Sequence, residues 1–310
     1  MDLSGAKPIT IADKPLFDRY FDQFPPEISE LTFTNLFMWR VYYHWQFLEW
    51  EKHLLLFSRD HLPKYHKSIR GNRDTLMFLP PIGPNPAQVV CNIFKLDRPV
   101  EFHRVPKFLW DALQILPEAR RQAIAWQDDR PNWDYEYLRS TLTTLSGGNL
   151  KPKRKWLNRF MTRYKYDFQL LSPNKPELLA CIKKAQDTWC QQNRCEDSSD
   201  LRMENEAIAE ALANYQALGF TGALILVEGS CIAYTFGEML HPGTMVTHIE
   251  KAHEEYEGGY QAIMSLFLQA DVWREIEFVN REQDLDSPGL RRAKESYDPH
   301  HMVQKGKLYR

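Results

Sequence analysis

The C-terminal half of the sequence alternates between helical and strand-like hydrophobic patterns, and this order restricts the fold more than any other feature. Residues 175–193 carry apolar side chains such as Leu178 and Trp189 at helical spacing, and residues 220–240 form two apolar runs around the turn Glu228–Gly229. The same two patterns predict further helices at 201–219, 256–273 and 288–297, and further strands at 244–252, 275–280 and 300–309.

The element order in this half is therefore α-α-β-β-β-α-β-α-β, which combines antiparallel hairpins with a βαβ unit. Such an order predicts an α+β fold built on a mixed sheet. The N-terminal half is less regular, but it also offers a helix near residues 14–24 and short strands at 53–58 and 76–81. We therefore expect helices packed on a mixed sheet in both halves of the chain.

A structural boundary is expected between residues 145 and 156. A glycine pair at 147–148 and Pro152 interrupt regular structure there, and the charge turns sharply basic. A chain of 310 residues is long enough for two domains. The predicted domains are 1–150 and 151–310, and a basic linker at 151–166 opens the second.

Composition excludes several classes of protein. The net charge of -2 does not favour a general polyanion binder, so binding of that kind needs a local patch. The five cysteines form no CxxC pair, which argues against a disulfide framework and a zinc ribbon and suggests the reducing cytoplasm. No signal peptide, transmembrane segment, nucleotide-binding glycine motif or structural metal site is expected.

In the stretch "FVNREQDLDSPGLRRAKESYDP", a short apolar strand is followed directly by many polar and charged side chains. Asn280 and Glu282 continue the inward face of the strand, at the end where α/β sheets place ligands. In the following helix, Lys294 and Tyr297 share a stripe with Leu290. Lys294 either reaches the surface or points into a cavity. These residues are candidates for catalysis and substrate binding.

A second candidate region runs from residue 248 to residue 260. The alternation of the strand places Glu250 on one face, where it is either a general base or a solvated carboxylate. Gly258 and Gly259 precede a helix that begins with Tyr260, and exposed amides at such a position bind phosphate. The alternative for the glycine pair is an ordinary turn, and the preceding glutamates would repel a pyrophosphate.

The segment "KPKRKWLNRFMTRYKY" carries seven basic residues and no acidic ones, with aromatic residues among them. Lys153, Arg154 and Lys155 are the candidate carrier-binding residues. Such a composition suits the phosphates of RNA or of anionic lipid headgroups. The alternative is a solvated helix between domains, whose aromatic side chains simply pack against the protein.

Three stretches resemble a known family: residues 134–160, the strand and loop "IEKAHEEYEGGYQAI", and the tail from Phe278 to Val303. They resemble a bacterial domain of unknown function related to the C-terminal catalytic domain of phosphatidylglycerol lysyltransferases. The resemblance covers nearly the whole chain. It implies two tandem GNAT-like domains, an arrangement shared with Fem-type aminoacyl transferases.

The resemblance also implies transfer of an acyl or aminoacyl group to an amine or hydroxyl. The donor would be acyl-CoA or aminoacyl-tRNA, and no bound cofactor is implied with certainty. Lys294 would stabilise the carbonyl or a carrier phosphate, Glu250 and Glu282 are candidate bases, and Asn280 could donate a hydrogen bond to the substrate. The expected partners are tRNA and, peripherally, anionic lipid.

Two hypotheses follow from the sequence. The first is an acyl or aminoacyl transferase, which the group of Asn280, Glu282 and Lys294 favours. The second is a non-catalytic GNAT-like module that binds a small ligand or RNA, which the acid-rich loop "EEYEGG" favours. The N-terminal half carries no recognisable site motif, so we expect it to be structural and to shape the substrate site. The sequence gives no indication of the oligomeric state.

Overall fold

The computed structural model describes residues 1–59 and 74–310, which form two compact units. The chain passes from the first unit to the second at Asp134 rather than near residue 150, and two later segments return to the first unit. The first unit comprises Met1–Asp134, Gln283–Asp286 and Met302–Arg310, and the second comprises Tyr135–Glu282 and Ser287–His301.

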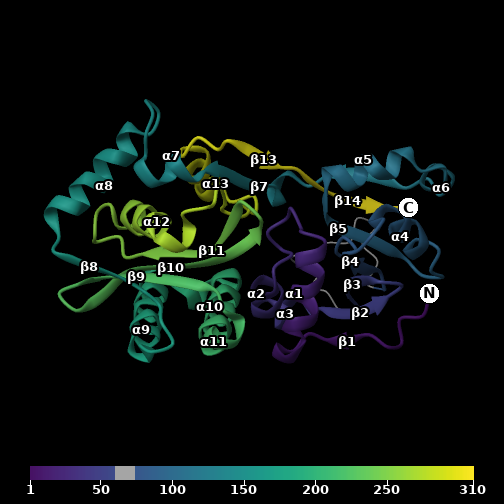
Figure 1. Ribbon diagram of the computed structural model, residues 1–310, viewed down its shortest axis with the longest axis horizontal. Coiled ribbons are helices and arrows are strands. Elements are labelled where there is room, and N and C mark those ends of the chain that lie inside the picture. The colour runs from purple at the N-terminus through teal and green to yellow at the C-terminus, as the bar shows by residue number, and fades with distance from the viewer. Residues whose placement is uncertain (60–73) are drawn as a thin grey trace. The chain divides into compact units, whose positions relative to one another are not determined.

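The first unit is built on a seven-stranded mixed sheet of order β1-β2-β3-β4-β5-β14-β6 (Figure 1). The strands β4 and β5 form a parallel pair, which α4 connects. The elements are β1 (Lys7–Pro8), α1 (Lys14–Gln23), α2 (Phe33–Met38), α3 (Arg40–Tyr43), β2 (Gln46–Trp50), β3 (His53–Ser58), β4 (Leu76–Phe78), α4 (Pro86–Ile93), β5 (Val100–Pro106), α5 (Lys107–Ile115), α6 (Pro117–Arg121), β6 (Ala125–Asp128) and β14 (Lys305–Tyr309).

The second unit has a seven-stranded mixed sheet of order β13-β7-β12-β11-β10-β9-β8. Its parallel pair is β11 and β12, which α12 connects. The elements are β7 (Asp134–Leu138), α7 (Arg139–Thr144), α8 (Lys151–Arg163), β8 (Tyr166–Leu170), α9 (Pro176–Gln192), α10 (Ser199–Ala213), α11 (Tyr215–Leu218), β9 (Thr221–Val227), β10 (Ser230–His241), β11 (Thr244–Ala252), α12 (Gly259–Gln269), β12 (Phe278–Asn280), α13 (Pro288–Glu295) and β13 (His301–Val303).

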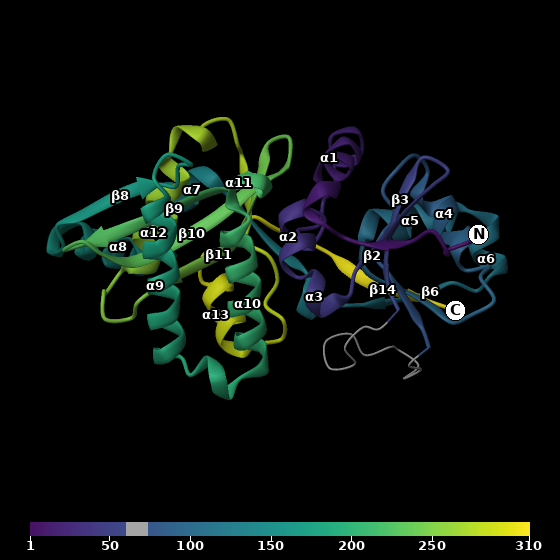
Figure 2. The ribbon, with the colours of Figure 1, turned by 90° about the horizontal axis from the view of Figure 1, so that it is seen from below.

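Helices cover both faces of the second sheet. Figure 1 shows α12 on one face and α9 to α11 on the other, and Figure 2 shows α9 and α10 side by side. The hydrophobic side chains of α12, such as Ile263 and Phe267, are fully buried against the sheet. This arrangement leaves β11 between α12 and α9, and parallel strands are usually covered by helices in this way.

Each sheet is completed by a strand from a distant part of the sequence. β14 inserts between β5 and β6 of the first sheet, although it lies at the C-terminal end of the sequence. β7 pairs with β12 of the second sheet, although it precedes the predicted boundary. The boundary expected at residue 150 would place β7 in the first domain, because it was based on glycine and proline residues. In the structure, these residues only separate α7 from α8.

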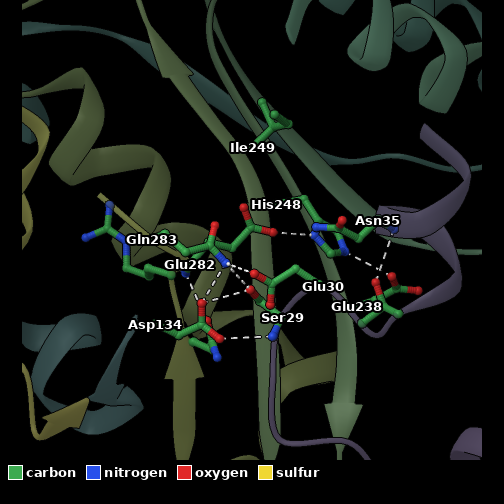
Figure 3. A network of polar contacts seen from close by, with 12 residues as sticks. Ser29, Glu30, Asn35, Asp134, Glu238, His248, Ile249, Glu282 and Gln283 are labelled. Atoms are coloured by element: carbon green, nitrogen blue, oxygen red, sulfur yellow. Dashed lines mark hydrogen bonds and ion pairs between the residues drawn. The ribbon is translucent and has the colours of Figure 1, made fainter. Parts of the chain in front are cut away.

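A buried ion network fixes these segments within the first unit (Figure 3). The side chain of Lys305 is fully buried and donates to Asp134 at 2.7 Å and to Glu30 at 2.5 Å. The Nε2 group of Gln283 donates to Ser29 Oγ and to Asp134 Oδ1, both at 2.7 Å. Because a buried charge without a partner is very costly, this network ties β14 and the segment at Gln283 to the start of β7.

Most elements predicted from the sequence are confirmed, as is the mixed α+β class. β3 and β11 match their predicted bounds, and the predicted turn at Glu228–Gly229 has positive φ at both residues. The predicted helix at 201–219 divides into α10 and α11, and the predicted strand at 300–309 divides into β13 and β14, which join different sheets. The latter prediction was wrong because a single hydrophobic run cannot show a change of sheet.

The cysteines include one pair that the sequence did not predict. Cys190 and Cys195 form a disulfide between the end of α9 and the segment before α10. Cys91, Cys181 and Cys231 are free thiols. An odd count and the lack of a CxxC motif excluded a disulfide framework but not a single local bridge, and the expectation of cysteines without disulfides is therefore corrected for this pair.

Candidate active site in the second unit

The candidate site begins where β11 and β12 stop pairing. These parallel strands pair over three residues only, and the last pair is Val246 with Asn280. Beyond this point, β11 continues through His248 and Glu250, with an irregularity in its register to β10 at His248, and Arg281 follows β12. The C-terminal ends of adjacent parallel strands are where α/β sheets bind ligands.

Arg281 connects the two separated strands. Its Nη2 group donates to Glu250 Oε1 at 2.8 Å, and the two side chains are only 13% and 11% exposed. Its guanidinium also lies 5.7 Å from the ring centre of Tyr137 and 5.0 Å from that of Tyr297. Burial raises the pKa of Glu250, although the charges of Arg281 and Lys294 oppose this shift. A carboxyl with a raised pKa is suited to accepting a proton from a substrate.

One hydrogen-bond donor of Arg281 has no partner among the described residues. Its Nη1 group is buried and, within the part of the chain that the structure describes, meets no acceptor. Lys153 of α8 lies 4.6 Å from the ring centre of Tyr297, the same ring that the guanidinium contacts. Burial and the charge of Arg281 lower the pKa of Lys153. The site therefore brings two cations together at one aromatic ring.

Helix α13 is held at the site by three contacts. Lys294 Nζ donates to the backbone carbonyl of Arg281 at 2.5 Å, and the Tyr137 hydroxyl donates to the carbonyl of Lys294 at 2.8 Å. Gln261 of α12 donates to the hydroxyl of Tyr297 at 2.9 Å. Lys294, Tyr297 and Glu250 were predicted from the sequence, and all three meet at Arg281.

Glu282 belongs to a second group centred on His248 (Figure 3). Both ring nitrogens of His248 contact carboxylates at 2.9 Å: Nδ1 contacts Glu282, and Nε2 contacts Glu238 of β10. Burial opposes the charge on the imidazole, but the hydrogen bonds that its ring N–H groups donate to both carboxylates outweigh it and raise the pKa of His248 to about 9. His248 is therefore a fixed cation at neutral pH rather than a proton acceptor.

Asn280 shapes the loop that carries these residues. It is fully buried, and its Oδ1 accepts the backbone N–H of Glu282 at 2.9 Å. Glu282 has a positive φ of 55°, which a non-glycine residue adopts only when its surroundings stabilise it. Asn280 therefore supports the turn through which Arg281 and Glu282 leave β12.

The remaining predicted residues lie outside the Arg281 group. At Gly258, a Cβ atom would lie 2.3 Å from the carbonyl oxygen of Trp156, so this glycine allows α12 to approach α8. The Gly259 N–H donates to a backbone carbonyl in the same turn. The hydroxyl of Tyr260 accepts the indole N–H of Trp189 at 3.4 Å. The glycine pair thus has the contacts of a packed turn.

Two of the three basic candidates on α8 have other surroundings. Arg154 donates to the backbone carbonyl of Leu145 at 2.7 Å, next to the end of α7. Lys155 is exposed on the surface of the helix. Arg159 and Arg163 both contact Glu257, so part of the acidic charge in the loop before α12 is already balanced. Among the three, only Lys153 reaches Tyr297.

Sequence reasoning missed the central residue, Arg281, and also Tyr137, His248 and Glu238. Arg281 stood in the polar stretch after β12 but was not selected, because a strand face defined by Asn280 and Glu282 excludes the residue between them. The signal that could have found Arg281 is the need of a buried Glu250 for a cation. Nothing in the sequence pairs Tyr137 with residues more than 100 positions later.

We also considered a metal site and a ligand cavity elsewhere in the protein. Within residues 1–59 and 74–310, no group of three or more His, Cys, Asp or Glu side chains could hold a metal ion. The first unit has a surface cavity of about 390 Å³ that contains none of the predicted site residues. Its lining is Thr75, Phe94, Leu96, Asp97, Arg98, Pro99, Val100, Glu101, Tyr309 and Arg310.

The two mixed sheets, and the polar groups where β11 and β12 separate, define a protein of two mixed α+β units with a candidate site in the second. The chain belongs to the family described as "Phosphatidylglycerol lysyltransferase, C-terminal", whose profile matches residues 21–306. Among the described residues, no helix is both long and apolar enough to cross a membrane.

Three solved structures and one curated protein are similar to this chain. A conserved protein of unknown function from Bacteroides thetaiotaomicron is 28% identical and has a TM-score of 0.83, with 98% of this chain and 99% of that one covered. L-PGS from Bacillus licheniformis is 15% identical with a TM-score of 0.63, covering 96% and 92%. The C-terminal domain of a protein assigned as a lysylphosphatidylglycerol synthetase from Agrobacterium fabrum is 11% identical with a TM-score of 0.65, covering 97% and 92%.

The curated protein is an uncharacterized protein of Mycoplasmoides gallisepticum. It is 26% identical over 179 residues, which are 56% of this chain and 54% of that protein. The match therefore spans about half the length of this relative. The family and the fold agree with the resemblance seen in the sequence, and the two structures below 25% identity support the fold alone.

Proposed function

We propose that the second unit transfers an aminoacyl group from a tRNA ester to an amine or hydroxyl acceptor. The observation that carries this proposal is the buried Glu250, bound by Arg281 and close to Lys294 at the point where β11 and β12 separate. Acyl transfer needs a base, a cation near the developing oxyanion and fixed positions for both, and these residues can supply each of them.

The proposed reaction proceeds in two steps. The acceptor nitrogen or oxygen attacks the ester carbonyl carbon, and Glu250 takes the proton that the nucleophile loses. The carbonyl oxygen becomes an oxyanion, which the ammonium group of Lys294 stabilises. The intermediate then collapses, the bond to the ribose oxygen breaks, and the leaving hydroxyl receives the proton from Glu250. Atoms and charges balance without a cofactor.

Glu250 is a better candidate base than Glu282. The pKa of Glu250 is raised by burial, which favours proton acceptance near neutral pH. Glu282 instead contacts the charged ring of His248 at 2.9 Å, so its carboxylate is already used in an ion pair. We therefore assign the proton transfer to Glu250 and a supporting electrostatic role to Glu282.

The donor is proposed to be aminoacyl-tRNA rather than acyl-CoA. The loop before α12 carries Glu254, Glu255 and Glu257, which do not suit the pyrophosphate of coenzyme A. Helix α8 begins with the exposed basic residue Lys151, which suits an RNA backbone or the surface of an anionic lipid layer. A lipid hydroxyl is the acceptor that the family name suggests, and the cytoplasm is the compartment that supplies charged tRNA.

The first unit is proposed to have a structural role.

A transfer assay tests this proposal. The purified chain is incubated with tRNA carrying a radiolabelled amino acid and with vesicles of phosphatidylglycerol, and product in the lipid phase is counted. Because general base catalysis contributes about 10²- to 10⁴-fold, Glu250→Gln should lower kcat by about 100-fold or more, and Glu282→Gln by less. Glu254→Gln, an exposed carboxylate of the neighbouring loop, is the matched control and should retain activity.

The alternative is a binding module without catalysis, which the acid-rich loop favours. A melting-temperature screen against acyl-CoAs, charged tRNA and uncharged tRNA separates the hypotheses. Stabilisation by charged tRNA without any transfer to an acceptor would support the binding module. Stabilisation by acyl-CoA alone would exclude the tRNA donor.

A further inference from the structure

The group around Arg281 carries more positive than negative charge. Arg281 and Lys153 are cations that lie at one aromatic ring, and Glu250 is the carboxylate that contacts Arg281. Arg281 and Lys153 both lie against Tyr297, so two like charges share one partly buried region of the protein. Such an arrangement costs free energy in the absence of a ligand, and it becomes favourable when an anion enters.

The buried Nη1 donor of Arg281 indicates where an anion would accept a hydrogen bond. Its Nη2 group is already used by Glu250, whereas Nη1 is buried without an acceptor among the described residues. Buried donors in native proteins nearly always have a partner, which can be protein, water or ligand. A guanidinium with one edge bound to a protein carboxylate and another donor unused is suited to an oxyanion.

Lys153 and Tyr297 complete the surroundings of this donor. Lys153 comes from α8 and Tyr297 follows α13, so two elements converge on Arg281 from different parts of the unit. The hydroxyl of Tyr297 is held by Gln261, which fixes the ring that both cations contact. The position of the cations is therefore set by packing and does not depend on flexible surface side chains.

We propose that Arg281, Lys153 and Tyr297 form a binding site for a phosphate group. A phosphate has the negative charge that this region lacks and enough oxygen atoms to accept from the guanidinium and the ammonium together. The phosphate belongs to a substrate of the transferase, as a phosphodiester of either the tRNA terminus or the lipid headgroup. The substrate assignment rests on the proposed function, but phosphate binding can be measured without any transfer.

Isothermal titration calorimetry on the full chain tests the site with three probes: inorganic phosphate, AMP and glycerol 3-phosphate. AMP represents the tRNA terminus, and glycerol 3-phosphate represents the lipid headgroup. At least one probe should bind at millimolar or lower concentration. Because hydrogen bonds to charged groups are strong, Lys153→Gln should weaken binding by about tenfold. The probe that binds most tightly identifies the source of the phosphate.

Lys155→Gln is the matched control. It removes the same charge from the same helix two residues away, but its side chain is exposed and does not reach Tyr297. Binding should change less than twofold. Equal losses in Lys153→Gln and Lys155→Gln would overturn the proposal, because they would show only a general effect of the basic helix. No heat of binding with any of the three probes would also overturn it.

Arg281→Lys gives a second test that keeps the charge beside Glu250. The lysine lacks the branched donor, so phosphate binding should fall by about tenfold while the melting temperature stays near that of the wild type. If this variant does not fold, Arg281→Gln combined with Glu250→Gln removes both charges of the pair together. Unchanged phosphate binding in a folded variant of either kind would contradict the assignment. Absence of transfer by the wild-type chain, with its phosphate binding intact, would instead count against the proposed function.

Discussion

Replacing His248 by glutamine should change the pH dependence of stability in a defined way. His248 is buried with its two ring nitrogens bound to Glu238 and Glu282, and its pKa in the folded protein is raised to about 9. In the unfolded chain its pKa returns to the ordinary value of 6.5. The folded state therefore binds a proton more tightly than the unfolded state, and protonation stabilises the fold.

The magnitude follows from these two values. Linkage between protonation and folding gives a contribution of about 3 kcal/mol at pH 6, about 2 kcal/mol at pH 7.5 and only a few tenths at pH 9.5. The contribution is fully present below pH 6.5 and is lost as the pH rises through 9. The side chain of His248 is only 1% exposed, so screening by solvent reduces this contribution little.

Urea unfolding of the wild type and of His248→Gln at these three pH values measures the effect. The difference in unfolding free energy between the two proteins should shrink by about 3 kcal/mol from pH 6 to pH 9.5. An NMR titration of the imidazole gives the folded-state pKa directly. A constant difference across the range, or a His248 pKa near its ordinary value, would refute the assignment of a fixed cation.

Three further changes have expected outcomes. Lys305→Met should destabilise the first unit by about 3–5 kcal/mol in urea unfolding, because it removes the cation bound to the fully buried carboxylate of Asp134, whereas Glu30 keeps its contact with Arg104. Gly237→Ala should lower the unfolding free energy by about 1–3 kcal/mol, because a Cβ would lie 2.1 Å from the carbonyl oxygen of Val246. Thiol titration in denaturant should find three free thiols without reductant and five with it, and loss of the Cys190–Cys195 bridge should cost about 2 kcal/mol.

Each of these changes has a matched control. Lys307→Met removes a charge from the same strand outside the buried network, and an equal loss of stability would contradict the role of Lys305. Gly148→Ala should be tolerated, because no atom lies within 4 Å of the added Cβ. Cys181→Ser removes a free thiol and should leave the bridge intact. Five free thiols without reductant would exclude the disulfide.

The fold could be predicted largely from the sequence where hydrophobic patterns are local. The strand at 244–252 and the helix at 14–24 follow directly from side-chain periodicity, and the structure confirms both within one residue. The partners of β7 and β14 could not be predicted in this way, because pairing depends on the whole sheet and leaves no mark in the strand itself. The predicted domain boundary at residue 150 differs from the division at Asp134 for the same reason.

The site was predictable only where a polar residue interrupts an apolar pattern. Lys294 and Tyr297 stood out on the helix stripe, and the structure brings both to Arg281. Arg281 itself did not stand out, because arginines in a polar loop are usually solvated. Its importance depends on burial and on the contact with Glu250, which are properties of the tertiary structure.

The position of β14 also affects the order in which the protein is made. A ribosome synthesises every strand of the second sheet before it reaches Lys305–Tyr309. The first sheet lacks an interior strand until then, although its other strands emerge first. The second unit can therefore complete its sheet while β5 and β6 still have open edges. Because open strand edges favour association with other chains, the nascent first unit is the part of the protein with most need of chaperones.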